Sequence, residues 1–265
     1  MNIPVIKVEA PNLPAGWEIA VLETWKNGIS IHTQYDKPGD PPSKDAFLVL
    51  SIDNPFDEPR IHRAMPGGIY DLEIYTQEVV DGIHDHWIDP ENGKWSYTYN
   101  QRLTAYKTPM TLYHTDQLQY VVDTLADTPY SRRAQAITWQ PWADTKDEHS
   151  PCLQRLHFRL VDNYLVMSAH MRSNDAFKAA FMNMYAFTAL QKSIADRISE
   201  KCGRKIKVGQ YNHVVDSFHI YGSYFEEFEG FLKSVSNRSW DDRTYWTSNV
   251  EEIFEEARER ISKSK

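Results

Sequence analysis

The sequence has few cysteines, no long apolar run and no excess of positive charge. Its 265 residues include two cysteines, Cys152 and Cys202, too few for a disulfide framework, so we expect free thiols in a reducing compartment. The net charge of −8 argues against broad nucleic-acid binding. Because no stretch approaches the roughly 18 apolar residues of a membrane span, and no secretory signal follows Met1, we expect a cytoplasmic protein without membrane contact.

Several motifs that identify cofactor or metal sites are also missing. We find no Gly-rich phosphate loop, no paired CxxC and no HExxH. The nearest metal candidate is the run His84-Asp85-His86, which offers two imidazoles and a carboxylate. No further ligand cluster completes a coordination shell, so we favour a solvated polar loop and predict no metal site.

The hydrophobic pattern predicts a mixture of helices and strands. Hydrophobic residues make up 41% of the chain, enough for one large core, so we expect residues 1–265 to form one catalytic domain. Because strict βαβ alternation is absent, the predicted class is α+β. Apolar spacing predicts helices over 16–27, 71–83, 117–126, 177–198 and 224–232. Alternation predicts strands over 46–52, 134–142 and 214–221, and a hairpin of 156–160 with 165–171.

A cysteine stands directly before the predicted hairpin, in the sequence Ser150-Pro151-Cys152. Proline fixes its own φ and holds the preceding residue extended, so Cys152 is presented rigidly at the end of a sheet. Such a position suits a nucleophile, although a cysteine is more often a small buried apolar residue. Both interpretations are open from the cysteine alone.

Other polar residues interrupt apolar or structured segments. Arg132 and Arg133 are adjacent at the entry to the strand predicted over 134–142, where they are either solvated or form a bidentate phosphate clamp. Asn183 is the polar exception within a strongly apolar helix, so its amide is satisfied locally or faces a ligand. His219 and Tyr221 lie two residues apart on one face of a predicted strand.

Four of these motifs occur together in a fixed order. These motifs are SPC with QRL, the SRR turn, RSxD followed eight residues later by Asn, and HIY. Together they resemble the thymidylate synthase family, which includes the pyrimidine nucleotide hydroxymethylases. The resemblance covers residues 87–221. It implies a mixed sheet packed with helices, with one face of the sheet forming a dimer interface.

The resemblance assigns the covalent and phosphate chemistry to residues of this chain. Cys152 would be the nucleophile that adds to C6 of a pyrimidine ring. Arg172 and Ser173 would hold the 5′-phosphate of the nucleotide beside it. Arg132 and Arg133 would reach across a two-fold interface into the site of the partner, which makes the protein a homodimer.

The remaining roles concern the base, the sugar and the folate. Asn183 would accept from N3–H and donate to O4, the pattern of uracil, while His219 and Tyr221 would bind the sugar hydroxyl. The phosphate clamp favours a 2′-deoxy substrate. Asp175 would contact the pterin of the cofactor 5,10-methylenetetrahydrofolate, and Trp87 would help to exclude water before hydride transfer.

For two residues expected to transfer protons, the sequence offers an alternative residue. Tyr99 is expected in the relay that removes the C5 proton, with Tyr97 as the alternative. Glu78 is expected to be the catalytic glutamate, with Glu73 as the substitute.

The chain departs from the family pattern at three places. His84 stands where the synthases carry a first tryptophan, and the loop 35–44 has no arginine for the phosphate. The last residues, 261–265, are polar where the synthases end in a short apolar segment. The first and third departures weaken water exclusion, which leaves a hydroxymethyl product open.

We therefore hold three functional hypotheses. The first is a thymidylate synthase that converts dUMP and 5,10-methylenetetrahydrofolate to dTMP and dihydrofolate. The second is a 5-hydroxymethylase acting on dUMP, dCMP or CMP. The third is a nucleotide-binding relative without turnover, which has no need of the thiol of Cys152.

Overall fold

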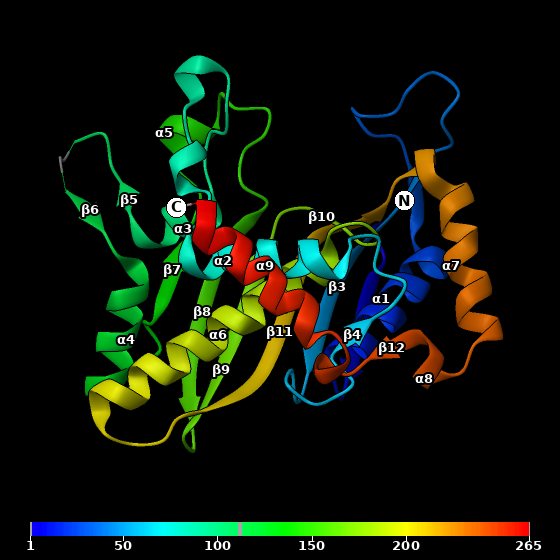
Figure 1. Cartoon of the computed structure of the whole chain (residues 1–265). Helices are drawn as coiled ribbons and strands as arrows, with labels where there is room; N and C mark the ends of the chain where they lie inside the picture. The colour runs from blue at the N-terminus through cyan, green and yellow to red at the C-terminus, as the bar shows by residue number, and fades with distance from the viewer. Residues whose placement is uncertain (1, 111–112, 265) are drawn as a thin grey trace.

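The structure, a computed structural model, describes residues 2–110 and 113–264 and has a mixed β-sheet with helices packed on it (Figure 1). The strands are β1 Val5–Ala10, β2 Ile29–Ile31, β3 Ser43–Ile52, β4 Ile61–His62, β5 Tyr106–Lys107, β6 His114–Thr115, β7 Gln135–Ile137, β8 Leu153–Val161, β9 Tyr164–Met171, β10 Asn174–Asp175, β11 Lys207–Ile220 and β12 Thr244–Tyr245. The α-helices are α1 Leu13–Asn27, α2 Ile69–Asp81, α3 Tyr99–Thr104, α4 Gln117–Asp127, α5 Pro141–Asp144, α6 Ala180–Cys202, α7 Phe225–Asn237, α8 Trp240–Arg243 and α9 Glu251–Ser264. Short 3-10 turns are η1 Asp85–Trp87, η2 Pro90–Asn92, η3 Gly222–Tyr224 and η4 Thr247–Asn249.

The main sheet runs in the order β1-β3-β11-β9-β8-β7, and outside this order β2 pairs with β3 and β10 pairs with β11. The pairs β1–β3 and β11–β9 are parallel, whereas β3–β11, β9–β8 and β8–β7 are antiparallel. The predicted α+β class with a mixed sheet is therefore confirmed. None of the helices within residues 2–110 and 113–264 has the length and apolar composition needed to cross a bilayer.

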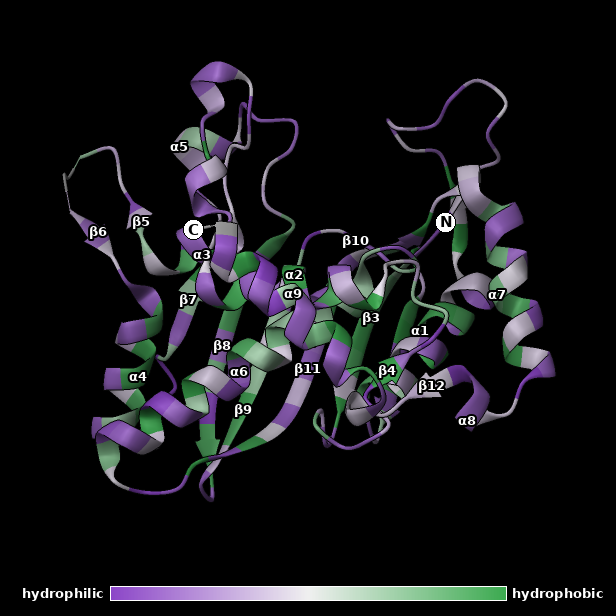
Figure 2. Ribbon diagram, in the orientation of Figure 1, coloured by the Kyte–Doolittle hydropathy of each residue, from purple (hydrophilic) through white to green (hydrophobic). Residues whose placement is uncertain are grey.

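One face of the sheet is buried under helices and the other is partly open. On β9, the side chains of Leu165, Met167, Ala169 and Met171 are buried, while those of the alternating residues between them are half-exposed. The same alternation runs through the first part of β11. Figure 1 shows α6 crossing in front of β8 and β9, with α9 in front of α2, and Figure 2 shows that α9 is largely hydrophilic. The hydropathy period of two along the strands explains this division.

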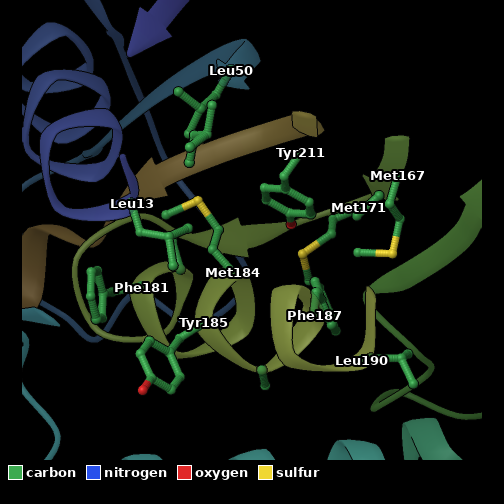
Figure 3. Packing of buried hydrophobic residues seen from close by; sticks show 14 of the residues in the cluster. Leu13, Leu50, Met167, Met171, Phe181, Met184, Tyr185, Phe187, Leu190 and Tyr211 are labelled. Carbon is green, nitrogen blue, oxygen red and sulfur yellow. The ribbon is translucent and has the colours of Figure 1, made fainter. Parts of the chain in front are cut away.

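The core is centred on α6, whose apolar residues meet both the sheet and the neighbouring helices. Phe181, Met184 and Phe187 are fully buried. Figure 3 shows them beneath residues of α1, β3, β9 and β11, among them Leu13, Leu50, Met171 and Tyr211. This packing anchors α6 rigidly, so polar residues on the helix are held in fixed positions relative to the sheet.

Most predicted elements are found, with one correction. The hairpin β8–β9 is antiparallel as predicted, and Asp162 and Asn163 form its turn with positive φ angles of 49° and 67°. The strand predicted over 134–142 is wrong beyond Ile137: β7 ends there, and Pro141 begins the short helix α5. Proline lacks the N–H of a strand ladder but suits the first position of a helix, which explains the break.

Candidate active site

The hairpin β8–β9 places Cys152 beside Arg172, because the antiparallel pairing brings the start of β8 next to the end of β9. The backbone N–H of Arg172 donates to the carbonyl oxygen of Cys152 at 2.9 Å. Its guanidinium donates from Nε to the carbonyl of Pro151 at 3.1 Å and from Nη2 to that of Ser150 at 2.6 Å. Arg172 thus fixes the backbone of the loop that presents the thiol.

The thiol of Cys152 is half-buried. Burial raises the pKa of Cys152, because the thiolate loses hydration, whereas the positive charge of Arg172 lowers it. The guanidinium is therefore the group in this structure that favours the nucleophilic thiolate. Cys202, at the end of α6, is also a free thiol, and its Sγ lies 3.8 Å from the carbonyl oxygen of Arg204.

Cys152 and Arg172 lie on the wall of a cavity of about 650 Å³, the size of a small-molecule site. We call it the Cys152 cavity. Five of the residues predicted for substrate binding or catalysis line it, namely Cys152, Arg172, Ser173, His219 and Tyr221. The segment 31–36, together with Asp45, Ser217 and Ser223, completes its lining. Figure 1 shows the loop that follows β2 projecting beyond the sheet, close to the beginning of α7.

The sugar-binding pair lies where β11 ends. His219 and Tyr221 form an edge-to-face aromatic pair with ring centroids 4.5 Å apart. Nδ1 of His219 donates to the carbonyl oxygen of Ser217 at 3.1 Å, and burial raises the pKa of Tyr221 to about 12. Both side chains line the cavity, and the hydrogen bond and the ring contact fix the orientation of His219.

Asn183 lies on α6 and is 7% exposed. Its side-chain oxygen accepts a hydrogen bond from the hydroxyl of Tyr75 on α2. Burial raises the pKa of Tyr75 far above its ordinary value, and the negative charges of Glu78, Tyr97 and Cys152 add to the rise. Tyr75 therefore remains a hydrogen-bond donor to the amide, and the Cys152 thiol is near enough to influence it electrostatically.

Tyr97 and Tyr99 lie side by side, with ring centroids 5.9 Å apart. The hydroxyl of Tyr99 is buried and accepts from the backbone N–H of Leu153 at 3.2 Å. Burial and the Cys152 thiolate raise the pKa of Tyr97, while Arg172 lowers it. The charge of Cys152 also raises the pKa of the buried Tyr99, so both phenols belong to the surroundings of the thiol.

Glu78, near the end of α2, is paired with His84. Nδ1 of His84 donates to Oε2 of Glu78 at 2.8 Å. Burial raises the pKa of Glu78, and His84 opposes that rise. Gly82 ends the helix with a φ of 64°, a left-handed conformation that turns the chain back and brings His84 over the carboxylate.

Glu73, the alternative glutamate, has a different environment. Its carboxylate accepts from Nε of Arg258 on α9 at 2.7 Å and from the amide of Gln77 at 2.8 Å. Its side chain is 4% exposed and joins α2 to α9. Of the two glutamates, Glu78 is the one whose charge raises the pKa of Tyr75.

The predicted folate residues lie in an aromatic cluster and at a turn. Trp87 is 43% exposed and stacks on His84 with ring centroids 3.7 Å apart, and Trp95 meets Trp87 edge to face. Oδ1 of Asp175 accepts hydrogen bonds from the backbone N–H groups of Phe177 and Lys178. Its other carboxylate oxygen accepts a hydrogen bond from the hydroxyl of Tyr224. Neither Trp87 nor Asp175 lines the Cys152 cavity.

Arg132 and Arg133 are exposed in the turn before β7 and do not line the Cys152 cavity of their own chain. The carbonyl oxygen of Arg132 accepts from His157, and the N–H of Arg133 donates to Ser131, so the backbone of the turn is anchored. Within the part of the chain that the structure describes, no group of three or more His, Cys, Asp or Glu side chains could hold a metal ion.

Two residues close to this site had no role in the sequence interpretation. Asp45 lies inside the apolar strand β3, and Tyr75 belongs to the apolar stripe of α2. Asp45 directly precedes the apolar run 46–52, and nothing in that pattern distinguishes its carboxylate from a solvated one. Nothing in the helical spacing distinguishes Tyr75 from an ordinary core aromatic.

Known proteins of one family match most of this chain. A family model described as thymidylate synthase matches residues 71–256. A Methanosarcina acetivorans protein named "Putative thymidylate synthase" is 27% identical over 230 residues, covering 86% of this chain and 95% of that protein. A Methanocaldococcus jannaschii protein of the same name is 27% identical over 219 residues, covering 81% and 90%. The chain belongs to the thymidylate synthase family.

Proposed function

We propose that the protein transfers a one-carbon unit to C5 of a pyrimidine 2′-deoxynucleoside 5′-monophosphate and is a thymidylate synthase acting on dUMP. The observation that carries the proposal is that Cys152, Arg172, His219 and Tyr221 line one cavity. A nucleophile, a cation for phosphate and two hydroxyl-binding groups are the set that covalent chemistry on a nucleotide requires. One catalytic domain spanning residues 1–265 would perform the reaction.

The five predicted residues that line the cavity each have a task in this proposal. Cys152 attacks C6 of the ring as a thiolate, and the charge of Arg172 stabilises that thiolate while its free donors, with Ser173, hold the phosphate. His219 and Tyr221 bind the sugar and fix its orientation. Positioning the ring over the sulfur accounts for much of the rate enhancement expected of such a site.

The base would be recognised by Asn183. Its amide is held by Tyr75, so its orientation is set before substrate binds. An amide can accept from N3–H and donate to O4, which favours uracil over cytosine. Glu78, with its pKa raised by burial, is suited to exchange protons with the ring. Tyr99 is the phenol that we place in the removal of the C5 proton, with Tyr97 as the alternative, because the Tyr99 hydroxyl accepts from the N–H of Leu153 beside Cys152 and keeps its own proton.

The residues present also fit a folate. The exposed face of Trp87, stacked on His84, offers a flat aromatic surface for a pterin, and Asp175 offers a carboxylate for its N–H donors. When bound, 5,10-methylenetetrahydrofolate would supply the one-carbon unit and the hydride that reduces it to a methyl group. The aromatic cluster would exclude water from that reaction.

A homodimer is part of the proposal. One face of the main sheet carries the half-exposed side chains of β9 and β11, an open surface suited to a second copy of the chain. The exposed turn with Arg132 and Arg133 lies next to that sheet, before β7. A two-fold axis would bring these arginines to the phosphate of the partner's substrate, where their planar donors pair with its oxygens.

One observation favours a hydroxymethyl product as the second candidate. The polar pair of His84 and Glu78 lies within the aromatic cluster, and a water molecule held by that pair would be placed to take the position of hydride. The reaction would then end in 5-hydroxymethyl-dUMP, or in the dCMP or CMP analogue if the base or sugar is recognised differently.

Product mass distinguishes the candidates. The protein is incubated with 5,10-methylenetetrahydrofolate and dUMP, dCMP or CMP, and the nucleotides are analysed by mass spectrometry. We expect dTMP, with dihydrofolate formed in equal amount. A hydroxymethyl nucleotide would replace the first candidate by the second, and tight nucleotide binding without any product would show a relative that only binds.

A further inference from the structure

His219 has a buried nitrogen with no partner. Its side chain is 5% exposed, and Nε2 has no hydrogen-bond partner among the described residues, although the residue lines the Cys152 cavity. A buried polar atom without a partner costs about 1–3 kcal/mol, so its retention indicates that a ligand supplies the missing hydrogen bond. The character of that ligand depends on whether Nε2 donates or accepts.

The surroundings of Nδ1 decide this question. Nδ1 lies 3.1 Å from the carbonyl oxygen of Ser217 and 3.4 Å from its hydroxyl oxygen. A carbonyl oxygen can only accept, so the proton of the neutral ring is on Nδ1. Nε2 then carries a lone pair, and the ligand group that meets it must be a donor such as a hydroxyl.

The hydroxyl of Ser217 is itself oriented by Asp45. It donates to Oδ2 of Asp45, so its oxygen is left to accept from Nδ1 of His219. Asp45 on β3 pairs directly with His219 on β11, and directly opposed residues of an antiparallel pair project from the same face. The carboxyl group is 8% exposed and also lines the cavity.

We propose that Asp45 is a positioning residue that, through Ser217, fixes the ring and tautomer of His219 so that Nε2 accepts a hydrogen bond from a sugar hydroxyl of the nucleotide. The carboxylate, the hydroxyl and the imidazole form one chain of hydrogen bonds that ends at the ligand. Each bond in such a chain polarises the next, so Asp45 strengthens an interaction that it does not itself make. This inference rests on the proposed function and adds a determinant of sugar recognition.

The test compares dUMP with 2′,3′-dideoxy-UMP, which lacks the hydroxyl that would donate a hydrogen bond to Nε2 of His219. Affinities are measured by calorimetry for the wild-type chain and for Asp45→Asn, Ser217→Ala and Asp53→Asn. Asp53 comes directly after β3, is exposed and accepts a hydrogen bond from the side chain of Gln210. Asp53→Asn is therefore the matched control. We expect Asp45→Asn and Ser217→Ala to weaken dUMP binding about tenfold, as for one hydrogen bond, and dideoxy-UMP binding less than about twofold.

A split between kinetic parameters gives a second readout. Asp45→Asn should raise KM for dUMP more than it lowers kcat, because the chemistry at Cys152 is untouched. The inference is overturned if the folded variants Asp45→Asn and Ser217→Ala bind dUMP as tightly as the wild type does. It is also overturned if their affinities for dUMP and for dideoxy-UMP fall by the same factor. If the wild type binds no pyrimidine nucleotide, the proposed function fails as well, so the two failures are distinguishable. Ser217→Ala alone decides the question if Asp45→Asn does not fold.

Discussion

Nδ1 of His84 donates to Oε2 of Glu78 across 2.8 Å, at the point where α2 has ended and the chain has turned back. Burial raises the pKa of the glutamate, and the imidazole limits that rise. The carboxylate proposed to exchange protons with the substrate is therefore tuned by a residue that stands where the synthases carry a tryptophan. The protonation of Glu78 and the polarity of the aromatic cluster are set by the same contact.

Replacement of His84 tests this tuning. His84→Phe keeps an aromatic ring on Trp87 but removes the hydrogen bond and the positive charge, so the pKa of Glu78 should rise further. If the reaction needs ionised Glu78, the acid limb of the pH profile of kcat/KM should move to higher pH. The profile is measured from about pH 5 to 9, the range in which such limbs fall.

The control for that measurement is His86→Phe. His86 contacts Trp87 edge to face, but its bond partners do not include Glu78. If the acid limb stays in place in His84→Phe, or moves equally in both variants, the pairing of Glu78 with His84 does not determine the pH dependence of kcat/KM.

The base specificity should depend on Asn183. Asn183→Asp exchanges the amide donor for a carboxyl group that suits the N3 and N4 edge of cytosine. We expect the ratio of kcat/KM for dCMP to that for dUMP to rise by at least about tenfold, as when one hydrogen bond is gained and another is lost. A constant ratio would mean that Asn183 does not recognise the base.

The shared arginines can be tested by mixing two inactive variants. Cys152→Ser lacks the nucleophile, and the double variant Arg132→Ala with Arg133→Ala lacks the proposed contribution to the partner. Each should be inactive as a homodimer. Co-refolding equal amounts should restore about a quarter of wild-type activity, because half of the dimers would be mixed and each would hold one complete site. No recovery, with mixed dimers shown by mass spectrometry, would contradict a site shared in this way.

A buried ion pair between Arg102 and Asp144 joins α3 to α5. Nη2 of Arg102 lies 2.7 Å from Oδ1 of Asp144, and both side chains are at most 5% exposed. Asp144→Ala leaves the guanidinium buried without its partner and should lower the free energy of unfolding by about 3–5 kcal/mol, measured by urea denaturation. Asp123→Ala, which removes the exposed pair with Lys201, should leave it almost unchanged. Equal effects would show that the burial of the pair is unimportant.

The hydrophobic pattern was sufficient for most of the fold. Helices α1, α2, α4 and α6 and the hairpin β8–β9 follow directly from apolar spacing and from the Asp162-Asn163 turn. The strand predicted over 134–142 was wrong beyond Ile137, because alternation continued past the point where Pro141 begins a helix. The alternation of apolar residues along a segment does not show at which residue a strand stops pairing with its neighbour in the sheet.

The site was predictable only where its residues belong to motifs. Cys152, Arg172, Ser173, His219 and Tyr221 line one cavity, as the ordered motifs suggested. Asp45 was missed because its meaning arises from strand pairing with His219, which no local pattern records. Tyr75 was missed for a similar reason, since its contact with Asn183 depends on how α2 packs against α6. Long-range packing, and not residue type, gives both residues their positions.

The covalent bond between Cys152 and the nucleotide is the central claim, and peptide mass spectrometry tests it most directly. The protein is mixed with 5-fluoro-dUMP and 5,10-methylenetetrahydrofolate, so that C5 has no proton to lose, and is then digested. We predict the nucleotide mass on the peptide that contains Cys152, and none on the peptide that contains Cys202 or on the Cys152→Ser variant. An unmodified Cys152 peptide in protein that converts dUMP, or turnover by Cys152→Ser, would contradict the account.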